Sequence, residues 1–188
     1  LDLSRLALAA SGERVTGFIV KATDRDYWVT LKRTGILVYN SVTKKDTVIF
    51  GNKSKQDNTY GTVIRDMQKG SDGNIWFTAG SKLYIVDPKT FSYKTFLAPV
   101  PDERIAELKI SPQRILFSKT GKILLYGQLR IYEFKNEKLI PVYPAKGFSD
   151  LSIEKITEDP DNNVWVQTAE GVYKTNSDFS RWESMNNL

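Results

Sequence analysis

Three aspartates recur in register along this chain and are the first residues to weigh for chemistry. Asp24, Asp72 and Asp161 each lie four residues before a tryptophan, in segments of the chain that resemble one another. Carboxylates can bind calcium or act as acid and base, but a calcium loop needs several oxygen ligands converging in one segment. The closest approach to such a loop, Asp159-Pro160-Asp161-Asn162-Asn163, is weak. We therefore predict that each of the three aspartates caps its own turn by accepting backbone N–H bonds, and we expect no metal site.

The sequence contains no histidine and no cysteine. The missing histidine removes the commonest general base and metal ligand, and the missing cysteine excludes disulfides, thiol nucleophiles and thiolate metal sites. We expect no catalytic residues and no cofactor, so this chain is not predicted to be an enzyme.

Charge and hydropathy exclude two further classes of partner. The net charge of +5 comes from basic residues that are spread along the chain, whereas a nucleic-acid surface usually shows a clustered basic stripe. No apolar run approaches the ~18 residues of a membrane helix. We expect no nucleic-acid binding, and any membrane attachment would lie in segments outside this chain.

The elements that must position any site repeat four times. Segments such as Asp72-Gly73-Asn74-Ile75-Trp76-Phe77 align without gaps, and we call the residue at the position of Trp76 the anchor. The anchors are Trp28, Trp76, Leu124 and Trp165, at spacings of 48, 48 and 41 residues. Nine positions before the anchors lie Ile19, Met67, Ile115 and Ile156, and eight positions after them lie Ile36, Tyr84, Tyr132 and Tyr173. Columns of large apolar residues in one register indicate a structural repeat.

Each unit is interpreted as four short antiparallel strands, which is typical of a β-propeller blade. The predicted blades cover about 15–50, 62–97, 105–143 and 152–183, with residues 1–14 as the tail of a preceding element and a turn or two over 102–108. Gly73, Gly121 and Asn162 lie where a left-handed backbone is needed, and Arg25 at that place should be strained. A β-sandwich is the competing architecture, but it gives no reason for a fixed repeat. The predicted fold class is all-β, with blades that form part of a larger propeller.

The second unit, with Tyr84 and Asp87-Pro88-Lys89-Thr90 downstream, resembles the two-component-regulator propeller repeat. The last unit, from Ile156 to Tyr173, looks similar, and the third departs most because Leu124 replaces the tryptophan. In that family such repeats form the extracytoplasmic sensor of hybrid two-component histidine kinases of Bacteroidetes, which respond to polysaccharide fragments. The resemblance implies a periplasmic or cell-surface location, with any kinase outside this chain. The second unit also looks like the repeat of streptogramin lyases, but those enzymes depend on a histidine base.

The candidate ligand-binding residues lie in loops. We predict that the tryptophan column packs between blades. The loops between second and third strands present Arg33, Lys82, Gln128 and Glu170, and cationic groups there could meet acidic sugars or carboxylates of a partner. Trp182 lies off the column and is the better candidate for an exposed aromatic, with packing on the fourth strand as the alternative.

The sequence therefore favours a non-catalytic propeller module for sensing a ligand, derived from a poly- or oligosaccharide, in a two-component signalling protein. Two alternatives stay open: an accessory propeller of a polysaccharide-acting or lyase-type enzyme, and a scaffold for protein assembly. The partners to consider are glycan fragments, another protein domain and a second copy of the chain.

Overall fold

A computed structural model of the chain describes residues 15–31, 35–50, 63–99, 112–127, 129–143 and 152–185. These residues form strands and turns, with no helix among them. The tail predicted over 1–14 and the turn predicted over 102–108 lie outside the described residues.

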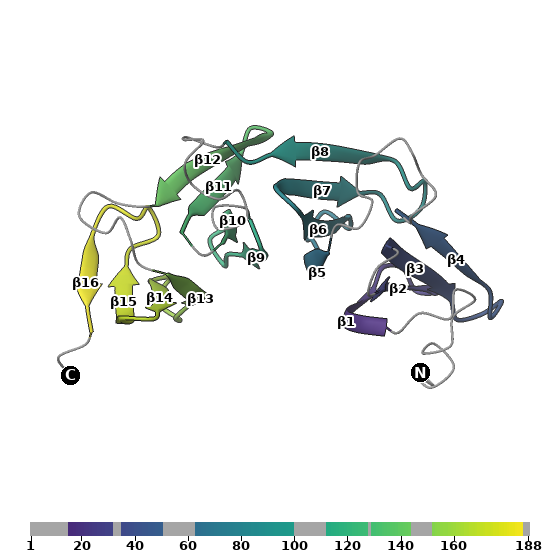
Figure 1. The fold of residues 1–188 in the computed structure, drawn as a ribbon, viewed down its shortest axis with the longest axis horizontal. Helices are drawn as coiled ribbons and strands as arrows, with labels where there is room; N and C mark the ends of the chain where they lie inside the picture. The colour runs from purple at the N-terminus through teal and green to yellow at the C-terminus, as the bar shows by residue number, and fades with distance from the viewer. Residues whose placement is uncertain are drawn as a thin grey trace. The chain divides into compact units, whose positions relative to one another are not determined.

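The strands form four antiparallel sheets, each hydrogen-bonded in sequence order (Figure 1). The first sheet contains β1 (Val15–Lys21), β2 (Asp26–Leu31), β3 (Gly35–Asn40) and β4 (Asp46–Ile49). The second contains β5 (Ile64–Lys69), β6 (Ile75–Ala79), β7 (Lys82–Val86) and β8 (Tyr93–Leu97). The third contains β9 (Arg114–Phe117), β10 (Ile123–Tyr126), β11 (Ile131–Lys135) and β12 (Lys138–Tyr143). The fourth contains β13 (Ile153–Glu158), β14 (Val164–Thr168), β15 (Gly171–Thr175) and β16 (Trp182–Ser184). The predicted all-β class and the four-stranded repeat are confirmed.

Side chains alternate along a strand, so neighbouring residues of a strand lie on opposite faces of its sheet. We call the face that carries the anchor the anchor face, and the face that carries the residues on either side of it the flanking face. The second strands that hold the anchors are rich in β-branched and aromatic residues, which suit a pleated surface.

The chain divides into two compact units, Leu1–Gly80 with Tyr84–Thr95, and Ser81–Leu83 with Phe96–Leu188. In the first unit, the anchor face of the first sheet packs against the flanking face of the second. The buried members of this core are Ala22, Trp28, Ile36, Val38, Met67, Ile75, Phe77, Ala79, Tyr84 and Val86. The anchor Trp28 is fully buried in it, which confirms the predicted packing role.

The second unit repeats the arrangement with the third and fourth sheets. Its buried core members are Leu124, Tyr126, Ile131, Ile153, Ile156, Val164, Val166 and Phe179. The anchor face of one sheet again meets the flanking face of the next, so the anchors of the first and third sheets are buried in the same way.

One column of the sequence alignment changes face in the first sheet. Trp28 pairs with Val38, ten residues on, whereas Trp165 pairs with Lys174, nine residues on. The additional residue moves Ile36 to the anchor face, and Leu37 takes the place that Tyr173 has in the fourth sheet. The alignment of Ile36 with the three tyrosines is therefore wrong by one residue.

The turns between first and second strands follow the prediction in three sheets. Gly73, Gly121 and Asn162 have φ of 82°, 83° and 63°. The strain predicted at Arg25 is wrong, since Arg25 is not among the described residues with positive φ. In that turn Thr23 Oγ1 accepts the N–H groups of Arg25 (3.2 Å) and Asp26 (3.0 Å), which gives the chain another way to reverse.

Candidate functional site

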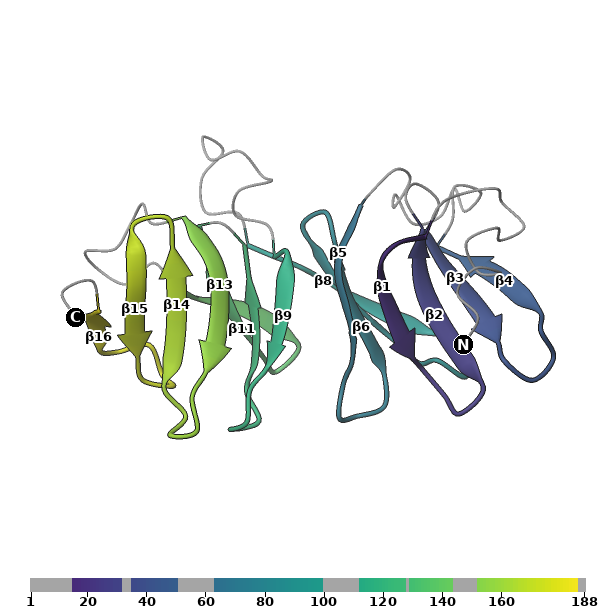
Figure 2. The same cartoon turned by 90° about the horizontal axis from the view of Figure 1, so that it is seen from below.

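Each sheet presents two sets of turns at its opposite ends. Because neighbouring strands are antiparallel, the first–second and third–fourth turns lie at one end and the second–third turn at the other. Figure 2 shows this in the fourth sheet, where the β13–β14 turn lies at the bottom of the view and the β14–β15 turn at the top. The predicted loop residues belong to the second–third turns.

Two of the predicted loop residues are described. Lys82 is the first residue of β7 and is partly exposed, and Glu170 is exposed in the β14–β15 turn. The Glu170 N–H donates to Thr168 Oγ1 at 3.2 Å, and that hydroxyl donates to the carbonyl of Gly171 at 3.1 Å, which fixes the backbone of the turn. Arg33 and Gln128 lie outside the described residues.

Trp182 lies at the other end of the fourth sheet from Glu170, because it follows the β15–β16 turn. Its ring is partly buried against the core of the second unit, with its centroid 6.1 Å from that of Phe179. Its indole N–H donates to the Phe179 carbonyl at 3.0 Å. Trp182 and Glu170 therefore do not meet in one site, and the packing alternative describes the position of Trp182.

The indole N–H groups of the anchors have unequal partners. Trp76 Nε1 lies 3.2 Å from both carboxylate oxygens of Asp72, and Trp165 Nε1 donates to Asp159 Oδ2 at 2.9 Å. The fully buried Trp28 Nε1 has no hydrogen-bond partner in the described part of the chain. Glycine at position 70 leaves room for the contact between Trp76 and Asp72, because a Cβ there would lie 2.7 Å from Trp76 Nε1.

The aspartates act in turns, although not all as predicted. Asp72 Oδ1 accepts the Asn74 N–H at 3.0 Å, which confirms its capping role. In the fourth sheet Asp159 is the cap instead of Asp161, since its Oδ1 accepts the N–H groups of Asp161 (3.0 Å) and Asn163 (2.9 Å). The cap predicted for Asp24 is also wrong, because its exposed carboxylate lies 3.7 Å from Lys21 Nζ while a threonine caps the turn.

Asp159 is the most perturbed carboxyl among the described residues. The hydrogen bonds donated by the Trp165 indole and the Asn163 amide lower its pKa from 3.8 to about 2. Above the Trp165 ring lies Lys174 Nζ, 5.7 Å from the ring centroid. The alignment of the repeats does not predict this role, because Asp159 stands six residues before its anchor, where the second unit has Gly70.

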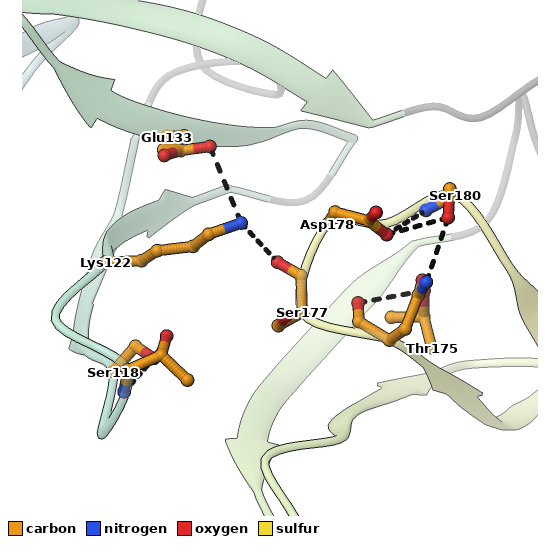
Figure 3. Close-up of polar contacts among 9 residues, drawn as sticks. Ser118, Lys122, Glu133, Thr175, Ser177, Asp178 and Ser180 are labelled. Atoms are coloured by element: carbon orange, nitrogen blue, oxygen red, sulfur yellow. Dashed lines mark hydrogen bonds and ion pairs between the residues drawn. The ribbon is translucent and has the colours of Figure 1, made fainter.

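A second polar cluster joins the third and fourth sheets (Figure 3). Lys122 Nζ donates to the Ser177 carbonyl at 2.6 Å and lies 4.0 Å from Glu133 Oε2. In the same turn Asp178 accepts hydrogen bonds from the hydroxyl and the N–H of Ser180, which lower the pKa of Asp178. These groups satisfy one another, so the cluster serves to hold two sheets together.

Neither the hydrogen-bonded groups around Asp159 nor the polar cluster around Lys122 has the composition of a metal centre. No group of three or more histidine, cysteine, aspartate or glutamate side chains able to hold a metal ion occurs within the described ranges. Those ranges also contain no helix long and apolar enough to cross a membrane.

The architecture of this chain is similar to that of several solved structures. No protein-family model matches the sequence, and no curated protein matches it. Among solved structures, the extracellular domain of the hybrid two component system BT4673 of B. thetaiotaomicron is similar over 88% of this chain, with a TM-score of 0.68 and 13% identity. That of BT3049 from the same organism is similar over 91%, with a TM-score of 0.62 and 17% identity. The chain is built of β-propeller blades.

The blades here match only part of those structures. The chain spans 21% of the length of each of the two extracellular domains. A catalytically inactive variant of virginiamycin B lyase from Staphylococcus aureus, solved with quinupristin, is similar over 95% of this chain and 58% of its own, with a TM-score of 0.63 and 13% identity. Because the sequence identities are only 13% to 17%, these similarities show a shared fold.

Proposed function

We propose that this chain is part of an extracytoplasmic propeller, in the periplasm or at the cell surface, that binds a ligand for a two-component signalling protein. The observation that carries the proposal is the match of its blades to the extracellular domains of two hybrid two component systems. The proposed module has no chemistry of its own, which fits a sequence without histidine or cysteine.

The proposed ligand is a poly- or oligosaccharide fragment, bound at the end of the blades that carries the second–third turns. The exposed Glu170 could accept hydrogen bonds from sugar hydroxyls, and the partly exposed Lys82 could pair with a sugar carboxylate. Arg33 and Gln128 are proposed as further ligand-binding residues from their place in the sequence. The position of Trp182 at the opposite end makes it the weakest of the five.

The competing function is an accessory blade set of a lyase-type or polysaccharide-acting enzyme. The structural similarity to virginiamycin B lyase is the reason to consider this enzyme-associated function. The inactive variant of that lyase has an alanine in place of a histidine, whereas the present sequence contains no histidine at all. Lyase chemistry of that kind would therefore need residues that this chain lacks.

Calorimetric titration of the chain with neutral and acidic oligosaccharides, paired with a product assay, separates these functions. The proposal predicts saturable binding without turnover, weakened about five- to tenfold by Lys82→Ala when the glycan is acidic. Lys135→Ala, an exposed lysine in β11, is the matched control and should bind normally. Turnover by this chain alone would overturn the proposal, and protein capture without glycan affinity would favour a scaffold.

A further inference from the structure

The β5–β6 turn of the second sheet contains a reactive peptide bond, the one between Asp72 and Gly73. It is the only Asp–Gly pair in the sequence, which contains no Asn–Gly pair. Because glycine has no Cβ, the backbone nitrogen that follows the aspartate is unshielded and can attack the carboxyl carbon of the aspartate. Such an attack leads to isoaspartate. Asp72 is exposed in this turn, so water reaches its carboxylate.

The rearrangement needs no reactant other than water. The Gly73 nitrogen forms a bond to Cγ of Asp72, and the amide proton leaves with the carboxyl hydroxyl as water, which closes a succinimide ring. Water then opens the ring at either carbonyl. Opening at Cγ restores aspartate. Opening at the original main-chain carbonyl frees that carbon as a carboxylate and leaves Cγ bonded to the Gly73 nitrogen, so the main chain is longer by a methylene group.

The folded turn holds both reacting groups in hydrogen bonds. The Gly73 N–H donates to the Gly70 carbonyl at 3.0 Å. The Asp72 carboxylate accepts the Asn74 N–H at 3.0 Å and the Asn74 side-chain amide at 2.9 Å. The Trp76 indole N–H lies 3.2 Å from both carboxylate oxygens. Ring closure removes one of these oxygens and uses the Gly73 nitrogen, so the turn must first give up hydrogen bonds that it makes when folded.

The fourth sheet has the same contact between an indole and an aspartate, but it lacks the reactive neighbour. Trp165 Nε1 donates to Asp159 Oδ2 at 2.9 Å. The next residue is Pro160, whose ring nitrogen carries no hydrogen. The same ring closure has no amide proton to release there. The fourth sheet therefore separates the contact from the chemistry and supplies a control.

We propose that Asp72–Gly73 is a modification site of this chain, where isoaspartate forms when the β5–β6 turn opens, and that the Trp76 indole holds the turn closed. The modified turn is longer and no longer presents the same carboxylate to the indole, so it does not close as before. The proposal rests on the chemistry of the turn and does not depend on the proposed function.

Tryptic peptide mapping with mass spectrometry follows the modification, because cleavage after Lys69 and Lys82 isolates the turn in one peptide. The folded chain is incubated at neutral pH beside the same chain unfolded in guanidinium chloride. We expect isoaspartate at position 72 to form at least about tenfold more slowly in the folded chain. Trp76→Phe keeps an aromatic ring but removes the indole N–H, and it should raise the rate in the folded chain about fivefold.

Two further variants separate the hydrogen bond of the indole from a general loss of stability. Gly70→Ala would place a Cβ 2.5 Å from Asp72 Oδ1, so it should displace the carboxylate and raise the rate as Trp76→Phe does. Trp165→Phe removes the equivalent donor from the fourth sheet. It is the matched control and should leave the rate at Asp72 unchanged.

Three results would contradict this assignment. The first is an equal rate in the folded and unfolded chains, a comparison that needs no variant. The second is an unchanged rate in Trp76→Phe and Gly70→Ala while circular dichroism shows both variants folded; if Trp76→Phe does not fold, Gly70→Ala decides. The third is an acceleration by Trp165→Phe as large as that by Trp76→Phe, which would assign the effect to general loss of stability.

Discussion

The first and second sheets, and the third and fourth sheets, form two packed pairs that fill the space between their sheets with different side chains. In the first pair the interface is aromatic: Phe50 packs edge-on to Phe77 at 5.3 Å, and Phe77 stacks on Tyr84 at 4.6 Å. In the second pair aliphatic residues such as Leu124 and Val166 replace the rings, and Lys122 crosses to the turn of the neighbouring sheet. A blade interface can therefore place aliphatic residues where another has stacked rings, while polar contacts at the turns also hold the sheets together.

The largest expected effect comes from removing an aromatic ring from the first pair. Phe77→Ala should cost about 3–5 kcal/mol, because the ring is buried and a cavity would remain. The equivalent Val166→Ala in the second pair should cost about 2 kcal/mol, since fewer buried carbon atoms are lost. Urea unfolding measures both, and amide exchange locates each effect in its own pair of sheets. A valine effect as large as the phenylalanine effect would contradict the comparison.

A smaller effect is expected from the lysine that crosses the second pair. Lys122→Met keeps an apolar stem but removes the bond to the Ser177 carbonyl, and we expect a loss of about 1 kcal/mol because the group is partly exposed. Lys135→Met, on an exposed lysine of the same sheet, is the control and should change stability by less than about 0.5 kcal/mol. Equal effects of the two substitutions would show that Lys122 contributes nothing specific.

The pH dependence of the second pair gives a more modest signal. A carboxyl whose pKa is lower in the folded chain stabilises it above the unfolded-state value, and this contribution is lost as the pH falls through the folded-state value. For Asp159 the window runs from about 4 down to about 2, and Asp178 in the same unit contributes in the same direction. Asp159→Asn should flatten the pH dependence of urea unfolding, followed by tryptophan fluorescence, and Asp161→Asn, at an exposed position two residues on, is the matched control.

The sequence predicted the repeat because packing between sheets demands large apolar residues at fixed strand positions. It predicted Gly73, Gly121 and Asn162 correctly, since a left-handed backbone selects those residue types. It misplaced Ile36 because one additional residue between strands reverses the face of every later side chain in the third strand.

The candidate site was less predictable than the fold. Loop charges such as Lys82 and Glu170 carry no periodic signal, so their place in a loop shows only that they are accessible. The hydrogen bond from Trp165 to Asp159 spans six residues and depends on the shape of the turn, which residue type alone does not specify. The same limit explains why the sequence predicts Asp161 as the cap, whereas the structure has Asp159 in that role.

The smallest expected effect tests the first-sheet turn, where sequence and structure disagree. If Arg25 had a strained left-handed backbone, Arg25→Gly would relieve it and stabilise the chain. Because Thr23 organises this turn and Arg25 is not among the residues with positive φ, glycine should bring no gain and at most a loss of about 0.5 kcal/mol through the freer unfolded chain. Asn162→Gly is the matched control, since Asn162 has φ of 63° and glycine there should be tolerated or mildly stabilising. Urea unfolding of the two variants decides the matter, and stabilisation by Arg25→Gly would favour a turn like those of the other three sheets.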